Sequence, residues 1–364
     1  MDKIQTIKSI YSQISLVGAK KENYVLATVT SVYGSTPQKP GSSALFGKSG
    51  LIAGTVGGGA VEHNISNIAL DAVKNKKSGY IKFNLTNQID EENGPICGGG
   101  MNILVDASPE KHAKIFASLQ NSLEKRIPGI LLTFAESQNQ EEFSIKRHFL
   151  TSENKSEAGS LLKTDVLKVA SEMLNYPVRS DFREMVIQET KHESRQYVFF
   201  ETILPPPRLL IAGAGHVGKA LSHLGKLLDF EVLVWDDRVE YSNKKNLPDA
   251  DHTFSGNMKK IFNKAEPDKN TYIVIVTRDH KNDAEVLKTF IGSNAGYIGM
   301  MGSKRKIVQL KEQFIENGWA TPDEWNKIYT PIGLEIHSKT VQEIAVSIAA
   351  QLVQVRNEIN VKNG

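Results

Sequence analysis

The sequence predicts an α/β protein: an N-terminal α+β domain, followed by a C-terminal Rossmann-like parallel sheet with helices on both faces. Three observations support this prediction. Short apolar runs alternate with helical stretches after residue 208, a glycine loop follows the first run, and three prolines at residues 205–207 precede it. Prolines stiffen a chain and donate no backbone hydrogen bond, so they suit a spacer. We therefore expect domains at residues 1–204 and 205–364.

The N-terminal domain should open with an amphipathic helix, because apolar residues recur at helical spacing over residues 4–17. Beyond it, apolar runs and a breaker-rich loop at residues 34–41 indicate strands and a helix. The expected strands span residues 24–32, 44–46, 51–56, 80–85 and 101–106, and the helix spans residues 60–74. The same domain should continue with a helix at 109–123 and strands at 130–134, 144–149, 183–188 and 196–202, whereas the polar stretch 151–180 shows no clear pattern.

The C-terminal domain should contain five short strands separated by helices, the pattern of a parallel sheet buried on both faces. The expected strands span residues 209–212, 232–235, 253–254, 273–277 and 297–301. Thr321 and Thr340 each stand three residues before a glutamate. This spacing is that of a capping box and predicts two helix starts, the second helix running to about residue 355.

Composition and charge narrow the class of protein. Of the 364 residues, 40% are hydrophobic and 23% are charged, so both domains can bury a core. The net charge is only +3 and no long basic run occurs, which gives little support to a nucleic-acid or membrane partner. The single cysteine, Cys97, cannot form an internal disulfide. With no signal-peptide core and no long apolar run, we expect a cytoplasmic protein, and its two domains suit a homodimer.

A glycine loop at the first C-terminal strand predicts a nucleotide site. Its motif residues are Gly213, Gly215, His216 and Gly218. The glycines let the backbone approach a pyrophosphate that rests on the helix N-terminus. Asp236 ends the second strand, where an acid holds the ribose hydroxyls of an NAD-like nucleotide, although Arg238 leaves an NADP-like one open. Alternatively, the fold has lost its ligand, and His216 merely begins the helix rather than contacting a nucleotide.

A polar cluster follows a later strand, at the sheet edge where ligands bind in such folds. Asp279 and His280 stand there, with Asp283 one helical turn further on. These side chains could hold a metal or form a proton-transfer pair. The alternative is that Asp279 only caps the helix that follows.

Two glycine triplets mark the N-terminal domain. Gly57, Gly58 and Gly59 open a helix and would present free N–H groups to an anion, while Glu62 in the first turn would otherwise only compensate the helix dipole. Cys97 precedes the second triplet, which includes Gly98 and Gly99. Backbone N–H groups of such a loop stabilise a thiolate, and thiolates suit soft metals and sulfur transfer. The alternative for Cys97 is a small buried hydrophobe.

Taken in order, these motifs resemble the XdhC/CoxI family of molybdenum-cofactor maturation factors. The likeness rests on segments 34–37, 57–62, 97–99, 213–218, 279–280, 297–299, 302–303, 331–334 and 343–350. The resemblance implies that the chain binds the molybdenum cofactor (molybdopterin), whose metal or sulfur Cys97 contacts and whose pterin or phosphate the triplets cradle. It also implies two partners, a cysteine desulfurase that sulfurates the cofactor and a xanthine dehydrogenase-type enzyme that receives it.

The chain departs from the family pattern at three places. Gln38-Lys39 and Ser43 stand where family members often carry arginine, and His337-Ser338 replaces a usual Gly-Ala pair. A loss of positive charge weakens the attraction for an anionic ligand, although Lys39 restores part of it. The chain could therefore serve a different molybdoenzyme.

Three hypotheses follow from the sequence. The first is a chaperone that binds and delivers the molybdenum cofactor and has no catalytic residue of its own. The second is an NAD(P)-dependent oxidoreductase that uses the Rossmann domain, although no Tyr-x-x-x-Lys pair stands out. The third is an interaction scaffold whose nucleotide site is vestigial.

Overall fold

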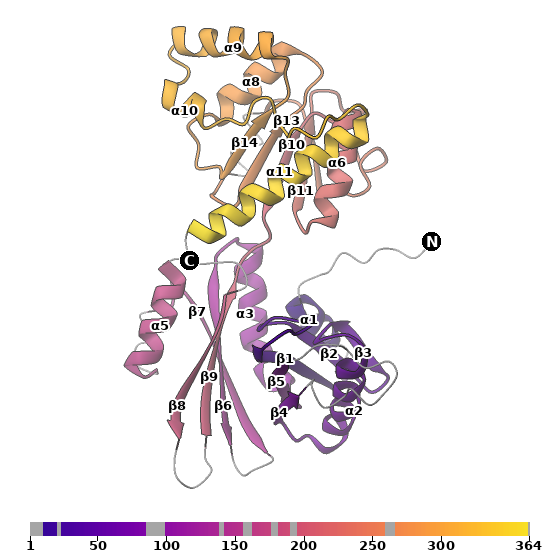
Figure 1. The fold of residues 1–364 in the computed structure, drawn as a ribbon, viewed down its shortest axis with the longest axis vertical. Helices are drawn as coiled ribbons and strands as arrows, with labels where there is room; N and C mark the ends of the chain where they lie inside the picture. The colour runs from indigo at the N-terminus through magenta and orange to yellow at the C-terminus, as the bar shows by residue number, and fades with distance from the viewer. Residues whose placement is uncertain are drawn as a thin grey trace. The chain divides into compact units, whose positions relative to one another are not determined.

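The computed structural model describes residues 10–19, 23–84, 99–137, 142–155, 162–175, 181–189, 195–258 and 266–362. Its internal contacts divide the chain between Pro205 and Pro206 into an N-terminal and a C-terminal unit. The N-terminal unit has antiparallel sheets, and the C-terminal unit has a parallel sheet between helices (Figure 1). The fold class expected from the sequence is therefore confirmed. None of the described helices is long and apolar enough to cross a membrane.

The first sheet of the N-terminal unit has the strand order β3-β2-β1-β5-β4 and is antiparallel throughout. Its strands are β1 Tyr24–Tyr33, β2 Ser43–Gly47, β3 Gly50–Gly54, β4 Gly79–Asn84 and β5 Gly100–Asp106. Helix α2, Gly59–Asn75, packs the side chains of Val61, Ile65 and Ala69 against this sheet. The sheet and α2 match the elements expected for this region to within a few residues.

The second sheet has the strand order β7-β6-β9-β8. Its strands are β6 Gly129–Ser137, β7 Phe143–Thr151, β8 Phe182–Glu189 and β9 Arg195–Ile203. Helix α5, Thr164–Asn175, covers one face of this sheet (Figure 1) and lies inside the stretch that showed no pattern. Val166, Ala170 and Met173 are buried in it and repeat at helical spacing, so the sequence carried this helical pattern and the prediction missed it.

The two antiparallel sheets share a core. Helices α1, Ile10–Ala19, and α3, Ala113–Glu124, contribute side chains to it, and the 3₁₀ turn η2, Pro109–His112, leads into α3. Tyr11 and Phe116 stack there with ring centroids 5.9 Å apart. The opening helix expected over 4–17 is thus seen from Ile10 onward, and residues 1–9 lie outside the described part of the chain.

The C-terminal unit contains a five-stranded parallel sheet of order β12-β11-β10-β13-β14. Its strands are β10 Arg208–Ala212, β11 Glu231–Asp236, β12 His252–Ser255, β13 Thr271–Ile275 and β14 Tyr297–Met300. Side chains alternate between its faces. Leu209 and Ile211 pack toward helices α6 and α11, whereas Leu210 and Ala212 pack toward α8 and α9. The order reverses between β10 and β13, and such a switch point is where ligands bind in α/β sheets.

The helices of this unit are α6 His216–Leu227, α8 His280–Phe290, α9 Lys304–Glu316, α10 Pro322–Asn326 and α11 Val341–Lys362. Both expected helix starts are confirmed. Thr321 and Glu324 form a reciprocal capping box, and Thr340 and Glu343 exchange the same pair of hydrogen bonds. Helix α11 continues beyond residue 355, where the expected helix ended, to Lys362.

Candidate functional site

The glycine loop of the C-terminal unit connects β10 to α6. A Cβ on Gly218 would lie 1.8 Å from the carbonyl oxygen of Gly213, so the fold itself requires this glycine. Gly215 is different, because a Cβ there would meet nothing within 4 Å. Gly215 is also the N-cap of α6 and supplies no side-chain cap. The first-turn N–H groups of α6, where His216 begins the helix, therefore face open space that an anionic ligand can enter.

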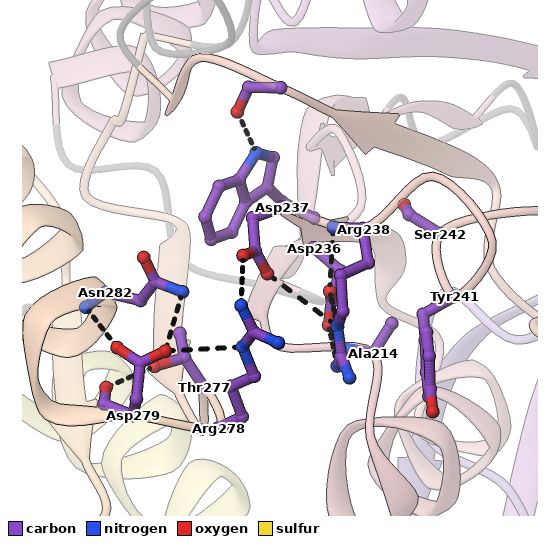
Figure 2. Close-up of polar contacts among 12 residues, drawn as sticks. Ala214, Asp236, Asp237, Arg238, Tyr241, Ser242, Thr277, Arg278, Asp279 and Asn282 are labelled. Carbon is purple, nitrogen blue, oxygen red and sulfur yellow. Dashed lines mark hydrogen bonds and ion pairs between the residues drawn. The ribbon is translucent and has the colours of Figure 1, made fainter.

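Asp236, at the end of β11, lies beneath this loop and is 3% exposed. Its Oδ2 accepts from the Ala214 N–H at 2.8 Å and from Arg238 Nη2 at 3.0 Å, and its Oδ1 accepts from the Arg238 N–H and Nε at 3.1 and 2.8 Å (Figure 2). Burial opposes ionisation, but the hydrogen bonds from Arg238 and Ala214 outweigh it and hold the pKa of Asp236 below its usual value. The carboxylate already accepts four hydrogen bonds, so it anchors the loop while Arg238 stays in place.

Arg238 is itself held on two sides. Its guanidinium carbon lies 3.7 Å from the ring centroid of Tyr241, a cation–π contact. The neighbouring acid, Asp237, extends the network toward β13, because its Oδ2 lies 3.2 Å from Arg278 Nη2 (Figure 2). Arg278 in turn pairs with Asp279 at 3.3 Å. A line of alternating charges thus crosses the carboxyl ends of β11 and β13, at the switch point of the sheet. Whether Asp236 or another acid holds a ribose there stays a prediction.

In the polar cluster after β13, each acidic side chain has a structural role. Asp279 is the N-cap of α8, and its Oδ1 accepts from the Asn282 N–H at 2.9 Å, a bond that holds its pKa below the usual value. Asp283 is 2% exposed and accepts from the Thr277 hydroxyl at 2.6 Å and from Lys306 Nζ at 2.5 Å. His280 is exposed. No group of three potential metal ligands occurs among the described residues.

The glycine motifs of the N-terminal unit converge on the loop after β1. Gly58 is the N-cap of α2 without a side-chain cap, and a Cβ on Gly58 or Gly59 would meet nothing within 4 Å. Gly57 lies against Pro37, and a Cβ on Gly99 would lie 2.4 Å from the carbonyl oxygen of Tyr33. Segments far apart in sequence therefore meet beside the open N-terminus of α2.

Glu62 and Cys97 also belong to this expected site. Glu62 lies in the first turn of α2, where its charge favours the helix dipole and opposes an anion at the same end. Cys97 and Gly98 lie outside the described residues, whose next segment begins at Gly99.

The structure also reveals a buried polar group that the sequence did not suggest. Arg147 on β7 pairs with Asp106 at the end of β5, and their side chains are 3% and 2% exposed. The Tyr11 hydroxyl donates to Oε2 of Glu201 on β9 at 2.5 Å. Burial lowers the pKa of His112, and so does the nearby Arg147 charge. No motif spacing could reveal these contacts, because Tyr11 and Glu201 are 190 residues apart.

Comparison with known proteins identifies the family. One family model, described as the XdhC Rossmann domain, matches residues 209–352, and another, the XdhC and CoxI family, matches residues 18–84. A Bacillus subtilis (strain 168) protein, named as a probable subunit of xanthine dehydrogenase, is 25% identical over 355 residues, covering 94% of this chain and 96% of that protein. The uncharacterized protein YqeB of Escherichia coli (strain K12) is 31% identical over 154 residues, 42% of this chain and 28% of YqeB.

Structural similarity agrees with the sequence matches. A solved structure from Bacillus halodurans, described as a xanthine dehydrogenase, covers 96% of this chain and 96% of its own with a TM-score of 0.73. At 21% identity this likeness shows a shared fold. The two family models fall on the two units, one on each, and the resemblance seen in the motifs is confirmed. The chain belongs to the XdhC and CoxI family.

Proposed function

We propose that this protein is an accessory factor that binds the molybdenum cofactor, assists its sulfuration by a cysteine desulfurase and inserts it into a xanthine dehydrogenase-type enzyme. Family membership and the relatives named for xanthine dehydrogenase support the client class. The observation that carries the cofactor-binding step is the open N-terminus of α2, surrounded by the glycine motifs.

The N-terminus of α2 has the chemistry to receive the cofactor's phosphate. The helix has 17 residues, and its N-cap leaves the first-turn N–H groups without a side-chain acceptor. Such groups, together with the helix dipole, bind anions. The absence of side chains at Gly58 and Gly59 lets a ligand approach the backbone directly.

Cys97 is the residue proposed to handle sulfur or contact the metal. It is the only cysteine of the chain and precedes Gly99 by two residues in the sequence. Gly99 packs on the backbone of Tyr33 and Ser35, beside the same loop that Gly57 approaches. A thiolate at this end of the site would meet the soft metal, while the helix N-terminus holds the phosphate.

One substitution tests the phosphate site without removing a structural contact. Gly58→Asp supplies a favoured N-cap residue, so α2 keeps its start, but its carboxylate occupies the N–H groups and repels an anion. Gly215→Asp makes the same change at the uncapped helix of the other unit and serves as the matched control. We expect Gly58→Asp to weaken binding of isolated molybdenum cofactor at least tenfold, and Gly215→Asp to leave it unchanged.

Cys97→Ala separates binding from sulfuration. The variant should deliver cofactor that fails to activate an apo xanthine dehydrogenase after incubation with a cysteine desulfurase and cysteine, whereas the wild type activates it. Equal activation by both proteins removes Cys97 from the mechanism. No binding of the cofactor by the wild type overturns the proposed function, and sedimentation of the same samples tests the expected homodimer.

We further propose that the glycine loop of the C-terminal unit binds a dinucleotide. Gly215 leaves the N-terminus of α6 open, which supports a pyrophosphate there. Calorimetric titration with NAD and NADP tests this proposal, and Gly215→Asp should abolish the binding of whichever nucleotide the wild type accepts. Failure of both nucleotides to bind the wild type refutes it.

A further inference from the structure

Two neighbouring cavities in the N-terminal unit share Glu201, from β9, and Phe182, from β8. The outer cavity measures about 270 Å³ and lies between the loop before β2 and the strands β8 and β9. Its lining includes Lys39, Ser42 and Thr202. The inner cavity, about 20 Å³, lies between the two sheets and has room for about one water molecule. Glu201 therefore stands at the junction of an open pocket and a polar interior.

Unpaired polar atoms gather at this junction. Arg147 lines the inner cavity and is 6% exposed, and its Nε has no hydrogen-bond partner in the described structure. Thr202 lines the outer cavity and is 7% exposed, and its Oγ1 is unpartnered in the same way. Nearly all buried polar atoms in proteins are paired, because an unpaired one costs about 1–3 kcal/mol. Thr202 follows Glu201 on β9, so its side chain points to the opposite face of the sheet, and neither unpaired atom is open to solvent. Of the polar side chains at the junction, Glu201 is the one that lines both cavities.

The carboxyl group of Glu201 is the acceptor of this site. Tyr11 donates to its Oε2 at 2.5 Å. Arg147, a buried cation that lines the same inner cavity, is already paired with Asp106. Burial raises the pKa of Glu201 to about 7, against the lowering effects of Tyr11 and Arg147. A ligand that brings N–H donors to this carboxyl group would replace the hydration that burial removed.

The other walls of the outer cavity suit a flat ring. Phe182 presents an aromatic side chain and continues a stacked series with Phe199, at 6.1 Å, and Tyr197, 5.9 Å beyond it. The charge of Glu201 would repel an anion, and an apolar ligand would offer no hydrogen-bond donor to its carboxyl group. The favoured ligand is therefore a planar heterocycle with adjacent N–H groups.

We propose that Glu201 binds the 2-aminopyrimidinone edge of a pterin ring in the outer cavity. This inference rests on the proposed binding of the molybdenum cofactor, whose organic part is a pterin. The ring amide and the exocyclic amino group present two parallel N–H donors, which a carboxylate accepts as a pair, as it does from arginine. Phe182 supplies the stacking face.

Lys39 lies between the outer cavity and the glycine motifs beside the N-terminus of α2. Lys39 lines the outer cavity and also borders the surface formed by Thr36 and Pro37. Pro37 in turn lies against Gly57, just before α2. A ligand whose ring occupies the pocket can therefore extend its charged end past the lysine toward the N-terminus of α2. Lys39 thereby supplies the positive charge that an anionic substituent requires along this path.

The test uses two ring probes and three variants of the full chain. Pterin carries the 2-amino group, and lumazine has a carbonyl group in its place. Fluorescence titration should show that the wild type binds pterin at least tenfold more tightly than lumazine. Glu201→Gln, which replaces one acceptor oxygen by a donor, should remove this preference. Glu184→Gln, on the adjacent strand β8 of the same sheet, is the matched control and should retain it.

The outcomes test the ring site at Glu201 separately from the proposed function. Phe182→Leu, which removes the stacking ring, should weaken pterin binding severalfold, and this measurement remains informative if Glu201→Gln does not fold. Equal binding of pterin and lumazine by the wild type, or an unchanged preference in Glu201→Gln, overturns the proposal. A parallel titration with the complete molybdenum cofactor separates the two proposals. If the wild type and Glu201→Gln bind the cofactor equally, the ring site is wrong and the proposed function stands. If the wild type binds pterin selectively but not the cofactor, the proposed function fails and the ring site stands.

Discussion

The substitution Glu201→Gln should stabilise the ligand-free protein above neutral pH. The carboxyl group has a pKa of about 7 in the fold, against an ordinary value of 4.5, a difference of about 2.5 pKa units. At 1.36 kcal/mol per unit, ionised Glu201 opposes folding by about 3 kcal/mol. Glutamine has no charge and can still accept the Tyr11 hydrogen bond at its amide oxygen, so the substitution removes the cost and keeps the contact.

The sign of the pH dependence follows from the direction of the shift. The folded state holds the Glu201 proton more tightly than the unfolded chain, so the contribution is fully favourable below pH 4.5 and is lost as the pH rises through 7. Most of the change, about 2–3 kcal/mol, occurs between pH 5 and pH 8. The charged or titratable groups facing Glu201 are Tyr11, Arg147 and, at the pocket mouth, Lys39 and Asp181, and none of them has an ordinary pKa between these two values.

Urea unfolding at pH 5 and pH 8 measures this effect. All three tryptophans, Trp235, Trp319 and Trp325, lie in the C-terminal unit, so their fluorescence serves as an internal control, while far-UV circular dichroism reports both units. The free energy of unfolding should fall between pH 5 and pH 8 by about 2–3 kcal/mol more in the wild type than in Glu201→Gln. A variant that is less stable than the wild type at pH 8, or that shows the same pH dependence, refutes the reasoning.

Three further predictions concern the fold and the glycine loops. Asp106→Asn leaves Arg147 buried without its counter-charge and should destabilise the N-terminal unit by about 3–5 kcal/mol, measured by urea unfolding; a loss below about 1 kcal/mol contradicts a buried pair. Gly218→Ala places a methyl group 1.8 Å from a backbone oxygen and should lower the midpoint of tryptophan-detected unfolding by far more than Gly215→Ala, which meets open space; equal effects would show that the loop is arranged differently. Asp279→Ala removes the N-cap of α8 and should cost about 1 kcal/mol in the same assay; an unchanged midpoint would mean that the cap carries no stability.

Much of the C-terminal unit could be predicted because its signals are local. The run Leu209–Ala212, the glycine loop and the helix after it are adjacent in sequence, and each requires the next. The capping boxes at Thr321 and Thr340 span three residues each and formed as expected. In contrast, α5 was missed although Val166, Ala170 and Met173 repeat at helical spacing in an otherwise polar stretch. Only the structure shows that the second sheet buries these side chains.

Side-chain roles depended on geometry that the motifs do not contain. The position of Asp236 predicted a ribose contact, but a rotamer of Arg238, two residues away, occupies both of its oxygens. The position of Asp279 was compatible with a site and with a cap, and its distance to the Asn282 N–H shows the cap. Only the arrangement in space distinguishes these alternatives, because the same sequence spacing allows each of them.

The sequence by itself therefore determined the family, the parallel sheet and the glycine-marked helix starts, because adjacent residues encode strands, turns and caps. The tertiary structure decided which of these features meet. It brought the glycine motifs together around residues 33–37, and it placed Tyr11, Arg147 and Glu201 around one polar junction. Nothing in the local sequence marks those three as neighbours, since each comes from a different element and their contact exists only once the two antiparallel sheets have packed.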